Sequence, residues 1–106
     1  MFQGLLVDIR KGIFGTSALK ITDFQATASK PSVGPFTAPA VEGWYTFNLT
    51  TAKAYINKAA TNSGLTQFRL RFKLDDNNNG IANYISFYSG NSATNKPMLI
   101  IQYYVP

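Results

Sequence analysis

A run of short polar residues at positions 75–80, DDNNNG, has the residue types and spacing of a calcium-binding loop. The candidate oxygen donors are Asp75, Asp76, Asn77 and Asn79. An EF-hand-type loop continues to a bidentate Glu at its twelfth position, and counted from Asp75 that position is Ser86. The second half of the motif is therefore absent. Two interpretations stay open: a cation site of another type, with Ca²⁺ as the candidate ion, and a hairpin turn in which Asn and Gly adopt positive φ.

A basic stripe precedes that loop. Arg69, Arg71 and Lys73 alternate with apolar residues, so on a β-strand they project from one face at intervals of roughly 7 Å. This spacing suits successive carboxylates of an extended polyanion, because Arg forks bind carboxylates. Tyr84 and Tyr88 follow the loop and are candidates for stacking on sugar rings. The alternative is a solvated sheet face on which the basic side chains provide solubility.

Trp44, the single Trp, directly follows Gly43. Its two interpretations are a sugar-stacking platform and a packing residue at the core or edge. Glu42 lies beside it in the sequence. A pair of catalytic carboxylates would require a second acid at a suitable separation, and the sequence identifies none.

Composition argues against an enzyme. The chain has 106 residues and is 45% hydrophobic, which suits one compact domain with its own core. It contains neither Cys nor His, so disulfides, thiolate metal sites and the side chain that most readily titrates near neutral pH are missing. The five acids are Asp8, Asp23, Glu42, Asp75 and Asp76. With so few groups for acid–base chemistry, we expect a non-catalytic protein.

The charge balance limits the partners. Ten Lys and Arg against five acids give a net charge of +5, which permits an acidic polysaccharide as partner without requiring one. Charged residues are only 14% of the chain, which is sparse for a nucleic-acid-binding protein, so nucleic acid is not expected. No window reaches the roughly 18 apolar residues of a transmembrane helix, so membrane insertion is not expected.

Hydrophobic periodicity predicts a chain made mainly of strands. Strands are expected over residues 5–10, 18–21, 44–50, 67–74, 82–90 and 98–105, a helix over 51–60, and an ordered loop over 30–43. Residues 22–29 are expected to form a turn of helix or a loop. The clearest alternation is in 67–74, where Phe68, Leu70, Phe72 and Leu74 are expected on a buried side.

These elements predict an all-β fold, an antiparallel, jelly-roll-like β-sandwich with one short peripheral helix and a single domain over residues 1–106. The strand count is low for two complete sheets. It favours a chain that is part of a larger module or that borrows a strand from a neighbour.

Residues 68–106, FRLRFKLDDNNNGIANYISFYSGNSATNKPMLIIQYYVP, closely resemble the C-terminal end of secreted modules called DNRLRE domains, which are related to repeats of archaeal disaggregatases. The pieces GLLVDIRKGIFGTSALKITDFQA and GWYTFNLT also fit, in the same order. These modules are grouped with a carbohydrate-binding class known for alginate binding. The resemblance implies a jelly-roll-like sandwich in an extracellular or cell-surface protein of bacteria or archaea. It also implies that strands of the full module precede GLLVDIR and are missing from this sequence.

We therefore expect a non-catalytic, extracellular carbohydrate-binding module that binds an acidic polysaccharide and requires no cofactor. The expected binding residues are Arg69, Arg71, Lys73, Tyr84 and Tyr88. The alternative is a structural stalk, adhesin or filament module that associates with neighbouring domains or identical subunits by β-strand addition.

Overall fold

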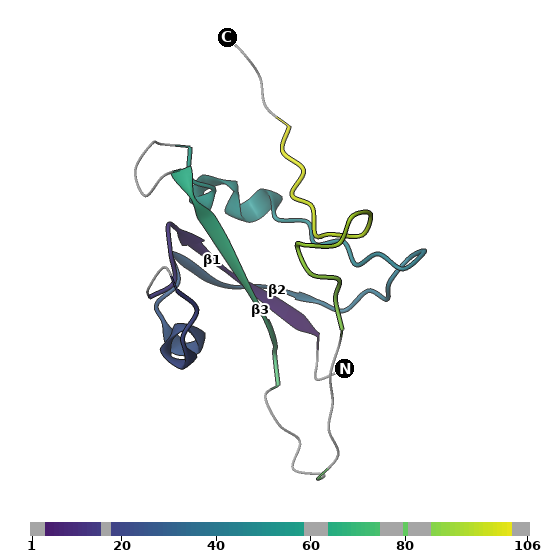
Figure 1. Cartoon of the computed structure of the whole chain (residues 1–106), viewed down its shortest axis with the longest axis horizontal. Coiled ribbons are helices and arrows are strands. Elements are labelled where there is room, and N and C mark those ends of the chain that lie inside the picture. Colours follow the sequence, from purple (N-terminus) through teal and green to yellow (C-terminus); the bar gives the residue numbers. More distant parts are fainter. Residues whose placement is uncertain (1–3, 16–17, 59–63, 75–79, 81–85, 103–106) are drawn as a thin grey trace.

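The described residues form a sheet of three strands. The computed structural model describes residues 4–15, 18–58, 64–74, 80 and 86–102. Its regular elements are β1 (Leu5–Lys11), η1 (Ile21–Gln25), β2 (Lys30–Phe36), η2 (Thr50–Tyr55) and β3 (Thr66–Phe72), where η marks a 3₁₀ segment. The strands form one antiparallel sheet in the order β2–β1–β3 (Figure 1). This agrees with the all-β prediction, whereas a second sheet is not seen within the described ranges.

β1 is the central strand and is the most buried part of the chain. Leu5 to Ile9 are all buried, because β1 pairs with β2 on one side and with β3 on the other. Val7 lies opposite Val33 of β2 and Leu70 of β3. The predicted strand over residues 5–10 is confirmed.

β2 lies where the sequence predicted a loop, and that prediction was wrong. Proline lacks a backbone N–H and is tolerated on an edge strand, and β2 is an edge strand with Pro31 and Pro35. Its pairing with β1 shifts register twice. Ser32 (φ 58°) and Gly34 (φ +118°) adopt positive φ within the strand. Pairing with the apolar strand β1 thus overrides a local composition typical of loops.

The hydrophobic core lies on one face of the β1–β2 half of the sheet. It consists of Val7, Ile9, Val33 and Ala52, with Phe36, Phe47, Leu49 and Tyr55 packed around them. Ala52 belongs to η2, which packs against β1 and β2. Over the described part of the predicted helix 51–60, the chain forms this shorter 3₁₀ segment and is irregular at 56–58, while residues 59 and 60 lie outside the described residues. Ile56 ends η2 with an extended backbone (φ −76°, ψ 123°).

The apolar side of β3 is only half covered. β3 confirms the predicted strand over most of 67–74, but Phe68 and Leu70 are 38% and 41% exposed. The expectation that this side is buried was therefore wrong at both residues. η2 covers the half of the sheet formed by β1 and β2, so the outer strand lacks a covering layer in the part of the chain that the structure describes.

The predicted strands over 44–50 and 18–21 are not regular strands in the structure. The chain makes an isolated bridge between Val41 and Trp44 and then no regular element over residues 45–49, because Phe47 and Leu49 pack onto the core instead of pairing with a strand. Residues 18–20 are irregular and lead into η1, so the helical-turn alternative for 22–29 is the one observed at its start.

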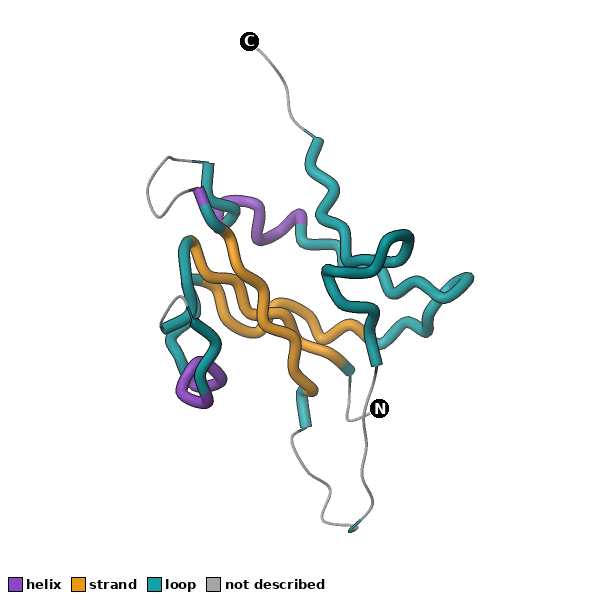
Figure 2. Tube along the Cα trace, in the orientation of Figure 1, coloured by secondary structure: helices purple, strands orange, loops and turns teal. Residues whose placement is uncertain are grey.

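The two C-terminal segments are also irregular where they are described. Residues 86–89 and 98–102 form loops (Figure 2), and the rest of these two predicted strands, 82–85 and 103–105, lies outside the described residues. In Figure 1 the 98–102 segment runs away from the sheet and lies apart from β3.

Candidate functional site

Asp8 is a fully buried carboxylate in the middle of β1. It is 0% exposed, although its neighbours in the strand are apolar. In the antiparallel register Asp8 lies opposite Arg69 of β3. Burial of an ionised carboxylate is costly unless it is paired and hydrogen-bonded, so the surroundings of Asp8 determine whether this strand can fold.

Arg69 is the first partner. Its Nη2 lies 2.7 Å from Asp8 Oδ2 and its Nε donates to the same oxygen at 2.8 Å. Its Nη1 donates to the carbonyl oxygens of Asp23 (2.9 Å) and Ala26 (2.8 Å). The Arg69 Cζ also lies 4.5 Å from the centre of the Phe14 ring, a cation–π contact. One guanidinium therefore joins β3 to β1 and to the η1 segment.

Arg71 and Ser32 complete the shell around the carboxylate. Arg71 Nε donates to Asp8 Oδ2 at 3.0 Å, and its Nη2 donates to Asp8 Oδ1 at 3.3 Å and to Ser32 Oγ at 2.6 Å. The backbone N–H of Ser32 donates to Asp8 Oδ1 at 2.8 Å. The positive φ of Ser32 thus belongs to the β2 geometry that brings this N–H to Asp8.

The charged form of Asp8 is stabilised in the folded chain. Burial by itself raises the pKa of the Asp8 carboxyl, because desolvation disfavours the charged form. Hydrogen bonds from Arg71, from the Ser32 backbone and from Arg69, with the positive charge of Arg71, outweigh burial and lower the pKa below its ordinary value of 3.8. The group is an ionised structural centre that holds all three strands together.

Two of the three residues in the predicted basic stripe are therefore turned toward a buried carboxylate. Arg69 and Arg71 contact Asp8, and their side chains are 18% and 37% exposed. Lys73 is exposed beyond the end of β3, and Tyr88 is 64% exposed. The remaining predicted residues, Tyr84 for sugar stacking and Asp75, Asp76, Asn77 and Asn79 for a cation, lie outside the described residues.

Trp44 and Glu42 lie together in an exposed turn. Trp44 is 40% exposed and its backbone pairs with Val41, while Glu42 is exposed in the turn between them at a φ of 51°. Among the residues that the structure describes, no three acidic side chains come together as a metal site.

The outer edge of β3 presents backbone hydrogen-bonding groups. The N–H of Lys73 donates to the Gly4 carbonyl at 2.9 Å, in the register that continues as Leu6 opposite Arg71 and Asp8 opposite Arg69. In an antiparallel ladder, such bonded positions alternate with positions whose N–H and C=O point away. The backbone groups of Phe68 and Leu70 therefore point toward the outer edge of β3, which pairs with no other strand among the described residues.

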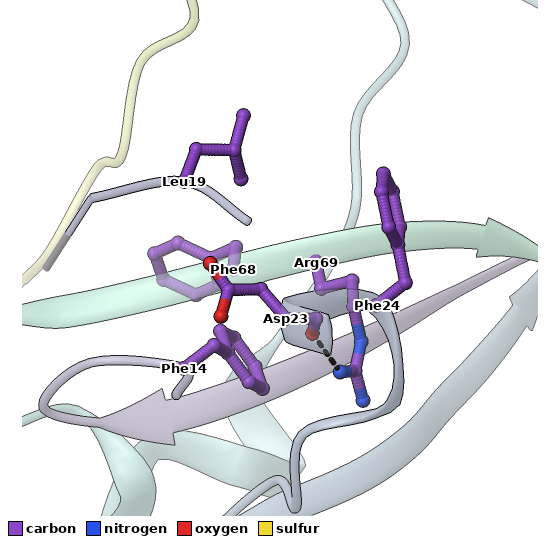
Figure 3. A pocket seen from close by; sticks show the side chains of 6 residues that line it. All are labelled: Phe14, Leu19, Asp23, Phe24, Phe68 and Arg69. Atoms are coloured by element: carbon purple, nitrogen blue, oxygen red, sulfur yellow. Dashed lines mark hydrogen bonds between the residues drawn. The ribbon is translucent and has the colours of Figure 1, made fainter. Parts of the chain in front are cut away.

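An apolar pocket lies beside that edge. It has a volume of about 140 Å³ and is lined by Phe14, Leu19, Asp23, Phe24, Phe68 and Arg69 (Figure 3). Phe68 and Arg69 are consecutive in β3 and point to opposite faces of the sheet, so the pocket adjoins the strand edge. The backbone N–H of Phe14 donates to Gln67 Oε1 at 2.9 Å and so ties the segment with Phe14 to the edge.

The roles of Asp8 and of this pocket were not predicted from the sequence. A signal for Asp8 was present, since a single acid interrupts an apolar strand while two arginines lie two residues apart in another. The pocket residues Phe14, Leu19 and Phe24 carry no comparable spacing pattern.

Comparisons with protein-family models, with curated proteins and with solved structures found no match for this chain. Within the described ranges, no helix has the length and apolar character needed to cross a bilayer.

Proposed function

We propose that this chain is a structural association module whose sheet is completed by another polypeptide, as in a stalk, an adhesin or a filament. The observation that carries the proposal is the set of large apolar side chains that the described residues leave exposed, beside the outer edge of β3 and in the segment Met98–Ile101.

Many of the described residues leave large apolar side chains exposed. They are Leu19, Ile21, Phe24, Val41, Trp44, Leu65, Phe68, Leu70, Phe87, Tyr88, Met98, Leu99, Ile100 and Ile101. The last four are consecutive in the sequence, and contiguous apolar exposure marks an interaction surface.

We also propose a more specific fold and a cellular location for this chain. The three-stranded sheet would be part of one layer of a jelly-roll-like sandwich, with the missing strands supplied by a neighbouring domain or an identical subunit. The resemblance to DNRLRE modules supports an extracellular or cell-surface location. An exposed edge strand next to an uncovered apolar face is a template for strand addition.

Binding of an acidic polysaccharide is the second candidate. It is favoured by the partial exposure of the Arg71 side chain (37%) and by the exposed Lys73 two residues further on. Because Arg69 and Arg71 already contact Asp8, this surface has less free positive charge than the sequence predicts. Salt-sensitive binding of a polyuronate to a monomeric chain would favour this candidate over the first.

Sedimentation velocity over a wide range of protein concentrations tests the first proposal. We expect the average mass to rise above that of one chain as the protein concentration increases, because association covers the exposed apolar side chains. A single 11.7 kDa species at every concentration would contradict it.

A further inference from the structure

Building on the proposed function, we infer that the partner is a second copy of this chain and that its Met98–Gln102 segment adds as a strand to the outer edge of β3. The acceptor is the β3 edge at Phe68 and Leu70, together with the adjoining pocket. The donor is a stretch of the same sequence that is left uncovered by its own sheet.

The acceptor offers both hydrogen bonds and apolar contacts. Phe68 and Leu70 direct their N–H and C=O groups outward, as the register shows. Their side chains are exposed on one face. The apolar pocket adjoins this edge: Phe68 itself lines it, together with Arg69 from the opposite face and with Phe14 and Phe24 (Figure 3). A strand added here would therefore be buried on both of its faces.

The donor has the composition that such a position requires. Strands buried on both faces read as continuous apolar runs instead of alternating ones, and Met98–Ile101 is a run of this kind. Ile100 is 80% exposed, Met98 66%, Ile101 53% and Leu99 49%. The segment makes no hydrogen bond to another described residue. It carries no charge, so its burial requires no ion pair.

The sizes of the two parts agree. Five residues in an extended strand span about 17 Å, which matches the central part of the seven-residue strand β3. The pocket of about 140 Å³ is close in size to a cavity of about 150 Å³ that holds a benzene molecule, so it accommodates one aliphatic side chain. Ile100 is the most exposed of the donor residues and is the side chain that we place in this pocket.

The donor and the acceptor are different surfaces of one chain, so the contact is heterologous. Two copies that exchange segments form a closed dimer, whereas copies that each donate to the next form an open chain. Both arrangements follow from the same junction, and both cover the segment that lies apart from β3 in the isolated chain (Figure 1).

The test uses one donor variant and one acceptor variant of the full chain. Ile100→Lys places a charge in the donor strand, and Leu70→Lys places one at the edge, where Lys is a common protection against strand pairing. We expect each variant alone to associate at least about tenfold more weakly than the wild type. Val41→Lys is the matched control, because Val41 is 70% exposed and lies outside both segments.

Mixing the two variants is the decisive measurement. Ile100→Lys keeps an intact edge and Leu70→Lys keeps an intact donor, so a one-to-one mixture can form one functional junction. We expect sedimentation to show a heterodimer in the mixture that neither variant forms alone. The milder Ile100→Ser, with circular dichroism as a check of folding, repeats the donor test if Ile100→Lys unfolds.

The experiments distinguish failure of the proposed β3 junction from failure of association itself. If the wild type associates and both variants associate equally well, association stands and the β3 junction is overturned. If each variant is weakened but the mixture forms no heterodimer, strand donation is likewise overturned. If the wild type stays a single chain at every concentration, the proposed function fails together with this inference.

Discussion

Asp8 connects the three described strands of the sheet through its two carboxylate oxygens. It is buried in the central strand, and its two oxygens receive hydrogen bonds from β3 and from β2. Such a carboxylate helps to specify how the strands pair, because a slip by one residue would turn both arginines to the opposite face of β3. It also explains why two arginines of the predicted binding stripe are only partly exposed.

Replacing Asp8 with Asn should destabilise the chain by about 3 kcal/mol, because Arg69 keeps its charge in a largely buried position without a counter-charge. Urea unfolding at one fixed protein concentration measures the change. Glu42→Gln removes an exposed acid and should change the free energy of unfolding by less than about 0.5 kcal/mol. Equal effects of the two substitutions would contradict a structural role for Asp8.

Because of the same ion pairs, we expect the free energy of unfolding to depend on pH. The folded-state pKa of Asp8 is lowered from 3.8, so its contribution to stability is complete above the unfolded-state pKa and is lost as the pH falls through the folded-state pKa. The difference in unfolding free energy between wild type and Asp8→Asn should be constant near neutral pH and should shrink below about pH 4. If the difference in unfolding free energy instead grows as the pH falls, the pKa of Asp8 is not lowered by folding.

At the scale of elements, the strands with regularly alternating apolar residues were predictable from the sequence. The pairing of these strands and the presence of β2 were not. β1 and most of β3 follow from the alternation of apolar residues. The contact between them was not predictable, because Asp8 and Arg69 are 61 residues apart in the sequence and periodicity carries no information on pairing. β2 was not predictable either, since Pro31 and Gly34 favour a loop until pairing with β1 overrides them.

Gly34 supports this irregular strand. Its φ is +118°, and a Cβ at this position would lie 2.9 Å from the Leu5 carbonyl oxygen. Gly34→Ala should therefore destabilise the chain by about 1–3 kcal/mol, measured as a fall in the urea midpoint. Gly90→Ala is the control, because a Cβ there meets no atom within 4 Å, and it should change the midpoint little. Equal midpoints for both variants would contradict the role given to β2.

At the scale of the whole molecule, the described residues leave the outer edge of β3 unpaired and many large apolar side chains exposed. The low strand count in the sequence favoured a chain that borrows a strand, and the structure adds that Phe68, Leu70 and an apolar pocket lie at this edge. Association by strand addition accounts for the open edge and for the apolar C-terminal segment together.

Amide hydrogen exchange at Leu70 tests this account most directly, because the N–H of Leu70 points to the open edge while that of Arg71 points to β1. In dilute solution we expect fast exchange at Leu70 and slow exchange at Arg71. At high protein concentration the Leu70 amide should become protected as an added strand accepts its hydrogen bond. Fast exchange at Leu70 at every concentration, with Arg71 protected throughout, would contradict the claim that another chain completes the sheet at the outer edge of β3.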